Sequence, residues 1–479
     1  MNVVLIVSDT FRRDHLGCYG NSWMKTPNID RLADSSIVFD NAYCGSFPTV
    51  PHRADLMTGR FVFTYFDWSP LPENELVLSQ ILGEAGYVTM MVADTPHILR
   101  DGYRFDRGFS AWRWVRGQEN DRYATAPRDV RVPCSPHKLR SPDGTMKQYL
   151  RNVSERRGEA DHFVAKTMTE ASRWLERNQD QERFLLYVDT FDPHEPWDPP
   201  QEYVDLYDPG YRGEEVIYPS YGACDYLSES EFKHVRALYA GEATLVDTWI
   251  GRLMEKVEDL GLLEDTAVIF TSDHGFYLGE HGLIGKSIIR GKTSQAVPLY
   301  EELARIPLIV RLPDGQNHGR RIGALVQPAD ILPTILELAG VPDPDTIHGK
   351  SLMPLIRREA DELRDCAVSS WSIVHGPKAW RPSTVTDHEW ALIYAGEVQR
   401  EAAATTHVVD SIPRSEKLLG GRGGPELYNI RVDPKQNENV IEQHRDVAER
   451  LHAMCVRFLE EVHTPEEFLQ YRRRIWGHT

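Results

Sequence analysis

Val3-Val4-Leu5-Ile6-Val7-Ser8-Asp9 opens the chain of 479 residues with an unbroken apolar run that ends in a carboxylate. A short apolar run without polar alternation is typical of a strand buried on both faces of a parallel sheet. Three later segments repeat the pattern, each with an aspartate at or just beyond its end: residues 87–94, 183–190 and 266–272. With a further apolar run at 307–312, the repetition predicts a set of buried strands.

Helical patterns separate these predicted strands. Apolar residues recur at helical spacing in residues 27–32, 160–177 and 229–260, and we expect the last helix to bend or break near Gly241. Strands that alternate with helices predict an α/β fold, in which helices flank a large, mostly parallel central sheet.

The pattern changes near residue 365. Short strand-like segments follow, at residues 366–372, 390–394 and 426–430, and a helical pattern closes the chain at about 440–462. We therefore expect a catalytic domain over residues 1–364 and a smaller α+β subdomain over residues 365–479.

The charge balance limits the partners of this chain. The sequence has 54 Lys and Arg against 72 Asp and Glu, a formal net charge of −18. This acidity predicts no binding to nucleic acid and none to anionic membranes, which both require clustered basic residues. A small anionic substrate stays compatible with it, because one pocket can be positive in an acidic protein.

Cysteine usage and hydropathy predict the compartment. The six cysteines are scattered without a C-x-x-C pair, and no stretch has the apolar length of a membrane span. We expect a soluble, cytoplasmic protein with reduced thiols. A homo-oligomer is left open, since the basic tail at residues 471–476 has the composition to reach a neighbouring subunit.

Acidic residues and histidines gather at the predicted strand ends. The four ends carry Asp9, Asp94, Asp189 and Asp273, and three of them add a histidine: His97, His194 and His274. Ligands of parallel sheets bind at this edge. Asp9, Asp273 and His274 together predict a site for one divalent cation with mixed oxygen and nitrogen ligands. Asp189 and Asp192 with His194 leave a second metal as an alternative.

A second feature is the segment Thr49-Val50-Pro51-His52-Arg53, where proline precedes an apolar helical run. A helix that opens here would offer free N–H groups to an anion, with the Thr49 hydroxyl at its start. Arg53 would lie one turn on, with the planar fork that grips a tetrahedral oxyanion. Residues 117–145, which are polar and contain proline, are expected to form a loop at the rim of such a site.

The same residues match a known family. Residues 49–60 resemble the sulfatase signature C/S-x-P-x-R…L-x-T-G-R, and residues 270–286 resemble the second signature. Further blocks of the family are matched in order at residues 14–20, 26–33, 192–197, 348–352 and 426–434. The chain is identified as a member of the sulfatase branch of the alkaline phosphatase superfamily.

The resemblance implies a role for each matching residue. Asp9, Asp273 and His274 would hold the metal, with Thr49 touching it as the nucleophile. Arg53, Lys286 and His194 would bind the substrate oxyanion, and either His194 or His97 would protonate the leaving oxygen. Thr95 stands in the substrate-binding place where the family has a lysine.

Three departures from the family pattern concern the chemistry. Thr49 replaces the Cys or Ser that sulfatases convert to formylglycine, so it would act as an ordinary hydroxyl in two displacements. Thr10 replaces a second acid, and His274 replaces an amide, which shifts the preferred cation from Ca towards Mn or Zn. With the lysine lost at Thr95, all three departures favour phosphate-type esters.

Three functions therefore compete. The first is a metal-dependent hydrolase that cleaves sulfate or phosphate-type esters through unmodified Thr49. The second is a phosphodiesterase or phosphonate monoester hydrolase with little sulfatase activity. The third is a non-catalytic family member that binds a small anionic ester.

Overall fold

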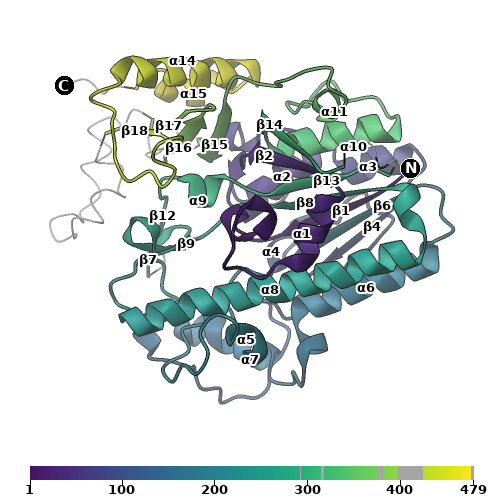
Figure 1. The fold of residues 1–479 in the computed structure, drawn as a ribbon, viewed down its shortest axis with the longest axis vertical. Coiled ribbons are helices and arrows are strands. Elements are labelled where there is room, and N and C mark those ends of the chain that lie inside the picture. Colours follow the sequence, from purple (N-terminus) through teal and green to yellow (C-terminus); the bar gives the residue numbers. More distant parts are fainter. Residues whose placement is uncertain (292, 314, 316–317, 375–380, 397–423, 476–479) are drawn as a thin grey trace.

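The computed structural model describes residues 1–291, 293–313, 315, 318–374, 381–396 and 424–475. Its main feature is an eight-stranded sheet with the order β14-β2-β13-β8-β1-β6-β4-β5 (Figure 1). The predicted strands lie side by side at its centre: β8 (Thr266–Ser272), β1 (Asn2–Ser8), β6 (Phe184–Thr190) and β4 (Val88–Ala93). They pair in parallel, as expected from their continuous apolar runs.

The outer strands make the sheet mixed. The predicted strand at 307–312 is β13 (Leu308–Arg311), and it runs antiparallel to both of its neighbours, β8 and β2 (Ile37–Ala42). β14 (Arg320–Val326) and β5 (Ala111–Trp114) form the two edges. The expected α/β class with a mostly parallel sheet is confirmed.

Helices cover both faces because successive residues of the central strands point to opposite sides. Val4 and Ile6 of β1 pack with α1 (Pro27–Asp34), α6 (Phe163–Asn178) and α8 (Glu229–Asp259). Val3, Leu5 and Val7 pack on the other side, with α2 (Thr49–Thr58), α3 (Leu78–Glu84) and α10 (Ile331–Ala339). Figure 1 shows α6 and α8 along one side of the sheet and α10 on the other.

α8 differs from its expectation at Gly241. The helix is continuous over 31 residues, without a break at this glycine. A Cβ on Gly241 would lie 3.1 Å from Pro199 Cγ and 3.2 Å from the Tyr203 carbonyl carbon. Gly241 therefore allows the segment that leads into α7 (Gln201–Val204) to approach the helix closely, and does not bend it.

The C-terminal region forms a second sheet, of order β18-β17-β16-β15-β3, under α14 (Arg445–Glu461). Four strands come from the expected subdomain: β15 (Ala367–Trp371), β16 (Ser383–Thr386), β17 (Trp390–Tyr394) and β18 (Glu426–Asn429). The fifth, β3 (Ser46–Phe47), comes from the segment before α2 and pairs in parallel with β15. The domain boundary at residues 364 and 365 stays a prediction.

The basic tail packs on its own chain. Arg472 is 1% exposed, and its guanidinium donates to Ser383 Oγ at 3.2 Å and to the Arg381 carbonyl at 2.9 Å. The part of the tail expected to reach another subunit is thus held by β16, and Trp476 lies outside the described residues. Oligomerisation stays a prediction.

The remaining elements are short. They are α4 (Pro96–Leu99), α5 (Lys147–Asn152), α9 (Glu301–Ala304), α11 (Met353–Ile356), α15 (Glu466–Leu469), β7 (Gly222–Ala223), β9 (Tyr277–Leu278), β10 (Leu283–Gly285), β11 (Ile288–Arg290) and β12 (Thr293–Gln295). Within the described ranges, no helix combines the length and the apolar character that crossing a bilayer requires.

Candidate functional site

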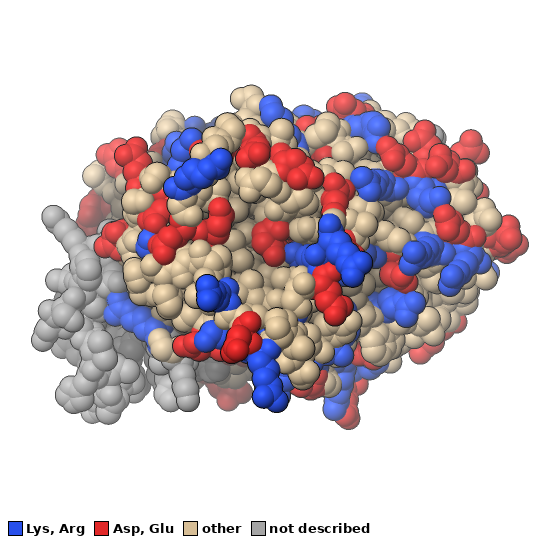
Figure 2. Space-filling model, turned by 90° about the horizontal axis from the view of Figure 1, so that it is seen from below, with Lys and Arg blue, Asp and Glu red and all other residues tan. Residues whose placement is uncertain are grey.

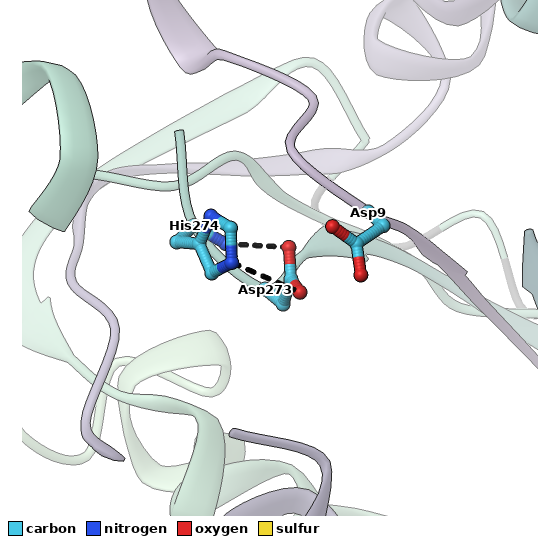
Figure 3. A group of neighbouring side chains, drawn as sticks. All are labelled: Asp9, Asp273 and His274. Carbon is cyan, nitrogen blue, oxygen red and sulfur yellow. Dashed lines mark hydrogen bonds and ion pairs between the residues drawn. The ribbon is translucent and has the colours of Figure 1, made fainter. Parts of the chain in front are cut away.

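The carboxyl ends of β1 and β8 bring three predicted ligands together. Asp9, Asp273 and His274 follow these adjacent strands directly, and one ligand atom from each lies within 4.8 Å of the others (Figure 3). All three side chains are fully buried. Parallel pairing places both strand ends at one edge of the sheet, which is why residues 264 positions apart in the sequence become neighbours.

This cluster fits a divalent cation. Among the described residues, neither carboxylate oxygen of Asp9 has a hydrogen-bond partner, although Arg53 Nη1 lies 3.0 Å from Oδ2. Burial, and then the charge of Asp273, raise the pKa of Asp9 well above its ordinary value. A buried carboxylate without hydrogen bonds is costly unless a cation neutralises it. The oxygen and imidazole donors suit such an ion.

His274 is oriented for ligation. Its Nδ1 lies 2.8 Å from the Gly275 carbonyl oxygen, to which it can donate, and this leaves Nε2 with a free lone pair. Burial lowers the pKa of His274 to about 3, so the ring is neutral. Burial opposes ionisation of Asp273, but its interactions with His274, Arg53 and Lys286 outweigh that effect and lower the pKa of Asp273.

Thr49 is the first residue of α2, beside this cluster. The expected helix start is confirmed, with Pro51 in the first turn, and Gly59, which has a φ of 67°, follows the last residue of α2. Lys286 Nζ donates to Thr49 Oγ1 at 3.0 Å, and His274 Nε2 lies 3.5 Å from the same hydroxyl. Lys286 Nζ is also 3.2 Å from His274 Nε2 and 3.9 Å from Asp9 Oδ1.

Arg53 takes a different position from the one expected. Its Nε and Nη2 bind Asp189 at 2.8 and 2.9 Å, and its Nη1 donates to Asp273 Oδ2 at 2.8 Å. The fork that we expected on a substrate oxyanion is thus already bidentate to Asp189. Arg53 is fully buried and contacts the carboxylates of Asp9, Asp189 and Asp273.

The acids of the second-metal alternative also have partners within the fold, and that alternative stays a prediction. Asp189 accepts from Arg53, from Tyr187 Oη at 2.6 Å and from Thr95 Oγ1 at 2.5 Å. Asp192 accepts from Gln118 Nε2 at 2.6 Å and from the Val164 amide at 3.0 Å. These carboxylates are used within the fold. Thr95 directs its hydroxyl to Asp189, not towards a substrate as its place in the family pattern implied.

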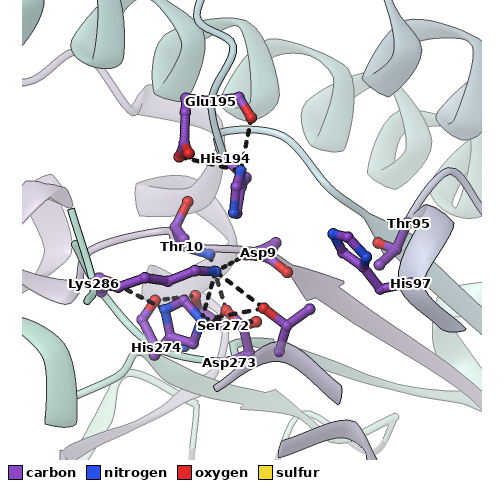
Figure 4. Close-up of polar contacts among 12 residues, drawn as sticks. Asp9, Thr10, Thr95, His97, His194, Glu195, Ser272, Asp273, His274 and Lys286 are labelled. Atoms are coloured by element: carbon purple, nitrogen blue, oxygen red, sulfur yellow. Dashed lines mark hydrogen bonds and ion pairs between the residues drawn. The ribbon is translucent and has the colours of Figure 1, made fainter. Parts of the chain in front are cut away.

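His97 and His194 approach the cluster from other elements. His194 follows β6 and is 2% exposed, while His97 lies in α4 and is 8% exposed. The Phe191 ring lies against both, stacked on His194 at 4.0 Å and edge-on to His97 at 5.5 Å between ring centroids. In Figure 4, His194 points towards Thr10 and Asp9, and His97 stands on the other side of Asp9 from Lys286.

Burial lowers the pKa of both rings. It lowers the pKa of His97, although Glu119 opposes the shift, and it lowers the pKa of His194 well below the ordinary value, with Lys286 and Arg140 adding to the effect.

Two glutamates that the sequence did not single out support these histidines. His97 Nε2 lies 3.0 Å from Glu119 Oε2, and His194 Nδ1 lies 3.2 Å from Glu195 Oε2. Glu195 stands next to His194 in the matched block, so its neighbour could have drawn attention to it. Glu119 belongs to the expected rim loop, and no sequence signal distinguishes it from the other acids there.

The surface outside the site carries mixed charge. On the face in Figure 2, Lys and Arg side chains are interspersed with Asp and Glu, without a continuous basic surface among the described residues. A phosphate backbone would need such a surface. The absence of nucleic-acid and membrane partners stays a prediction.

Known proteins resemble this chain over most of its length. A family model described as sulfatase matches residues 1–341. An arylsulfatase of Clostridium perfringens is 25% identical over 96% of this chain and 94% of its own. An N-acetylglucosamine-6-O-sulfatase of Bacteroides thetaiotaomicron is 27% identical over 92% of this chain and 82% of its own.

A solved structure shares the fold. The crystal structure of a phosphonate monoester hydrolase of Agrobacterium radiobacter matches with a TM-score of 0.72 at 21% identity, over 96% of both chains.

Proposed function

Because the chain belongs to the sulfatase family, whose members hydrolyse esters, we propose that it cleaves a small sulfate, phosphate or phosphonate ester through the unmodified hydroxyl of Thr49. One observation carries this proposal. Thr49 Oγ1, at the start of α2, lies within 3.5 Å of both Lys286 Nζ and His274 Nε2, at the edge of the Asp9 and Asp273 pair.

The metal site belongs to the same proposal. Asp9, Asp273 and His274 would hold one divalent cation, with Thr49 at its side, and the imidazole ligand favours Mn or Zn over Ca. When bound, such a cation lowers the pKa of an adjacent oxygen acid, for water from about 15.7 to about 7, and neutralises charge on the transferred group.

Two displacements account for turnover. Thr49 Oγ1 gives its proton to solvent and bonds to sulfur or phosphorus, while the ester oxygen departs and takes a proton from His97 or His194. Water then attacks the same sulfur or phosphorus and breaks its bond to Thr49 Oγ1. One proton of this water restores the Thr49 hydroxyl, and the other returns to the histidine. Ester and water are thus converted to an alcohol and a free oxyanion. Lys286 donates to the nucleophilic oxygen and supplies positive charge where the oxyanion gathers.

The choice of acid rests on the charges around each ring. The negative charge of Glu119, at 3.0 Å, stabilises a proton on His97. His194 faces Lys286 and Arg140, whose positive charges disfavour its protonated form. We therefore assign proton donation to His97 and binding of the oxyanion to His194.

A second candidate function is a phosphodiesterase or phosphonate monoester hydrolase with little sulfatase activity. Thr49 favours it, because an O-substituted threonine cannot expel its group by the elimination open to formylglycine, and phosphoryl groups suit a second displacement by water. For this reason we do not assign to this chain the sugar sulfate named for the Bacteroides thetaiotaomicron relative.

Thr49→Val is the decisive variant, because valine has the shape of threonine without its hydroxyl. We expect kcat/KM on the best substrate to fall by more than about 10³-fold. Aryl sulfate, aryl phosphonate and bis-aryl phosphate should be assayed with Mn, Zn and Ca. Thr58→Val is the matched control in α2, where the hydroxyl donates to the Ala54 carbonyl at 2.7 Å, and should keep activity.

The outcomes separate the three functions. The ranking of the three substrates distinguishes a sulfatase from a phosphonate or phosphodiester hydrolase. Full turnover by Thr49→Val would rule out Thr49 as the nucleophile. No turnover of any of the three esters by the wild-type protein, with metal bound, would instead support a member that only binds its anion.

A further inference from the structure

His97 and His194 each contact a buried glutamate. Glu119 is 3% exposed and contacts His97, and Glu195 is fully buried and contacts His194. His194 Nδ1 also lies 2.7 Å from the Glu195 carbonyl oxygen. Figure 4 shows Glu195 beyond His194, on the side away from Asp9. In both pairs the carboxylate oxygen Oε2 faces the ring.

One guanidinium joins the two pairs. Arg140 Nη2 donates to Glu119 Oε1 at 2.9 Å and to Glu195 Oε1 at 2.7 Å. The same nitrogen thus binds the oxygen of each glutamate that does not face a histidine. Arg140 comes from residues 117–145, the segment expected at the rim of the site, and its side chain is 16% exposed.

Two tyrosines hold this guanidinium in place. The Arg140 Cζ lies 4.3 Å from the ring centroid of Tyr218 and 4.2 Å from that of Tyr221. Tyr218 Oη donates to Glu119 Oε1 at 2.8 Å, and Tyr221 Oη donates to Glu195 Oε1 at 2.5 Å. The arrangement repeats itself on the two sides of Arg140, with one tyrosine, one glutamate and one histidine on each.

The backbone at Glu119 adds an independent observation. Its φ is 45°, in the left-handed region that a residue with a Cβ rarely adopts. Such strain costs free energy and persists where the surroundings impose it, most often at functional sites. The carboxylate of this residue contacts both Arg140 and His97.

We propose that Arg140 is a positioning residue for both histidines, acting through Glu119 and Glu195. This rests on the proposed function, in which His97 gives a proton to the leaving oxygen. In this proposal Arg140 acts through the two glutamates and not on the substrate itself. Its charged Nη2 group holds two carboxylates at set positions, and these fix the orientation of both rings.

The proposal predicts a dependence on the leaving group. An ester with a good leaving group, such as 4-nitrophenol, needs little proton donation, whereas a phenyl ester needs much more. Loss of Arg140 should lower kcat/KM for the phenyl ester by roughly 100-fold, and for the 4-nitrophenyl ester by less than about tenfold. A residue that only stabilises the fold would lower both by the same factor.

The experiment compares Arg140→Met, Arg140→Lys and a control on these two esters, with the metal-loaded enzyme. Arg116→Met is the matched control, because Arg116, which directly precedes the segment that contains Arg140, binds Asp121 with Nε and Nη2 at 2.7 and 2.6 Å. Lysine keeps the charge but loses the planar group that lies against the Tyr218 and Tyr221 rings, so Arg140→Lys should recover part of the phenyl ester activity.

Equal losses on both esters in Arg140→Met would overturn the proposal, as would the same selective loss in Arg116→Met. Should Arg140→Met fail to fold, Glu119→Gln tests the His97 side alone and must show the selective loss. The proposed function is judged separately, by wild-type turnover and by Thr49→Val. An active wild type with an unselective Arg140→Met would refute only the positioning role.

Discussion

At the residue scale, Arg53 shows how tertiary structure redirects a side chain. Its sequence position suggested a contact with substrate, yet its guanidinium is fully buried and binds Asp189 and Asp273. Three carboxylates, including Asp9, surround this one cation. Without it these buried carboxylates would repel one another, so Arg53 stabilises the arrangement that presents Asp9 and Asp273.

Arg53→Lys should therefore destabilise the protein. A lysine ammonium is a single point and cannot bind Asp189 with two donors while also reaching Asp273. We expect a loss of about 3 kcal/mol in the free energy of unfolding, measured by urea denaturation. Arg31→Lys is the control, since Arg31 is 62% exposed and pairs with Glu255 at 3.6 Å. Equal stability of the two variants would contradict this role.

At the element scale, the end of α2 is tied to a distant loop by His348. The His348 amide donates to the Gly59 carbonyl at 2.8 Å, and the Phe61 amide donates to His348 Nδ1 at 3.1 Å. Burial lowers the pKa of His348 to about 4, since a charged ring would be poorly solvated. A proton on Nδ1 would also remove the acceptor of Phe61.

This linkage predicts a pH dependence of stability. Between pH 6.5 and about 4, the unfolded chain holds a proton on this residue that the folded chain excludes. The contribution of His348 is thus full above pH 6.5 and is lost as the pH falls towards 4. Glutamine in His348→Gln can still accept from the Phe61 amide but does not titrate. The free energy of unfolding of this variant should therefore fall less than that of wild type as the pH falls from 6.5 to about 4.

The measurement is urea denaturation at a series of pH values. His137→Gln, in the exposed part of the rim segment, removes a histidine without touching α2 and serves as the control. If the free energy of unfolding changed with pH equally in His348→Gln and in wild type, His348 would not contribute to the pH dependence of stability.

At the scale of the whole molecule, a bound cation would couple the two halves of the main sheet. The proposed ligands follow β1 and β8, and Thr49 begins the helix that leaves β3 of the second sheet. A ligand that binds only the folded state raises its stability in proportion to the logarithm of its concentration over Kd.

Removal of the metal should accordingly lower Tm. We expect a chelator to reduce the Tm of wild-type protein by several degrees, equivalent to about 3 kcal/mol at a hundredfold excess over Kd. Addition of Mn, Zn or Ca should restore it to different extents. Asp9→Asn should respond less to the chelator. An unchanged wild-type Tm, with no metal found by elemental analysis, would refute the site.

Features that depend on local pattern were mostly predictable from the sequence. Continuous apolar runs indicated β1, β4, β6 and β8, and the carboxylates at their ends indicated the cluster of Asp9, Asp273 and His274. β2, β14 and β16 were missed, because none of them contains an apolar run as long as those of the central strands. The expected break at Gly241 was wrong, because this glycine makes room for Tyr203, which lies outside α8.

What the sequence by itself determined is the class of fold, the family and the set of chemical groups, since these depend on residue type and spacing along the chain. Only the tertiary structure decided which of these groups contact one another. It placed Arg53 and Thr95 on Asp189, and it brought Glu119, Arg140 and Glu195 together behind His97 and His194. Ion pairs and hydrogen bonds depend on distances of a few ångströms between segments, and spacing along the chain does not contain them.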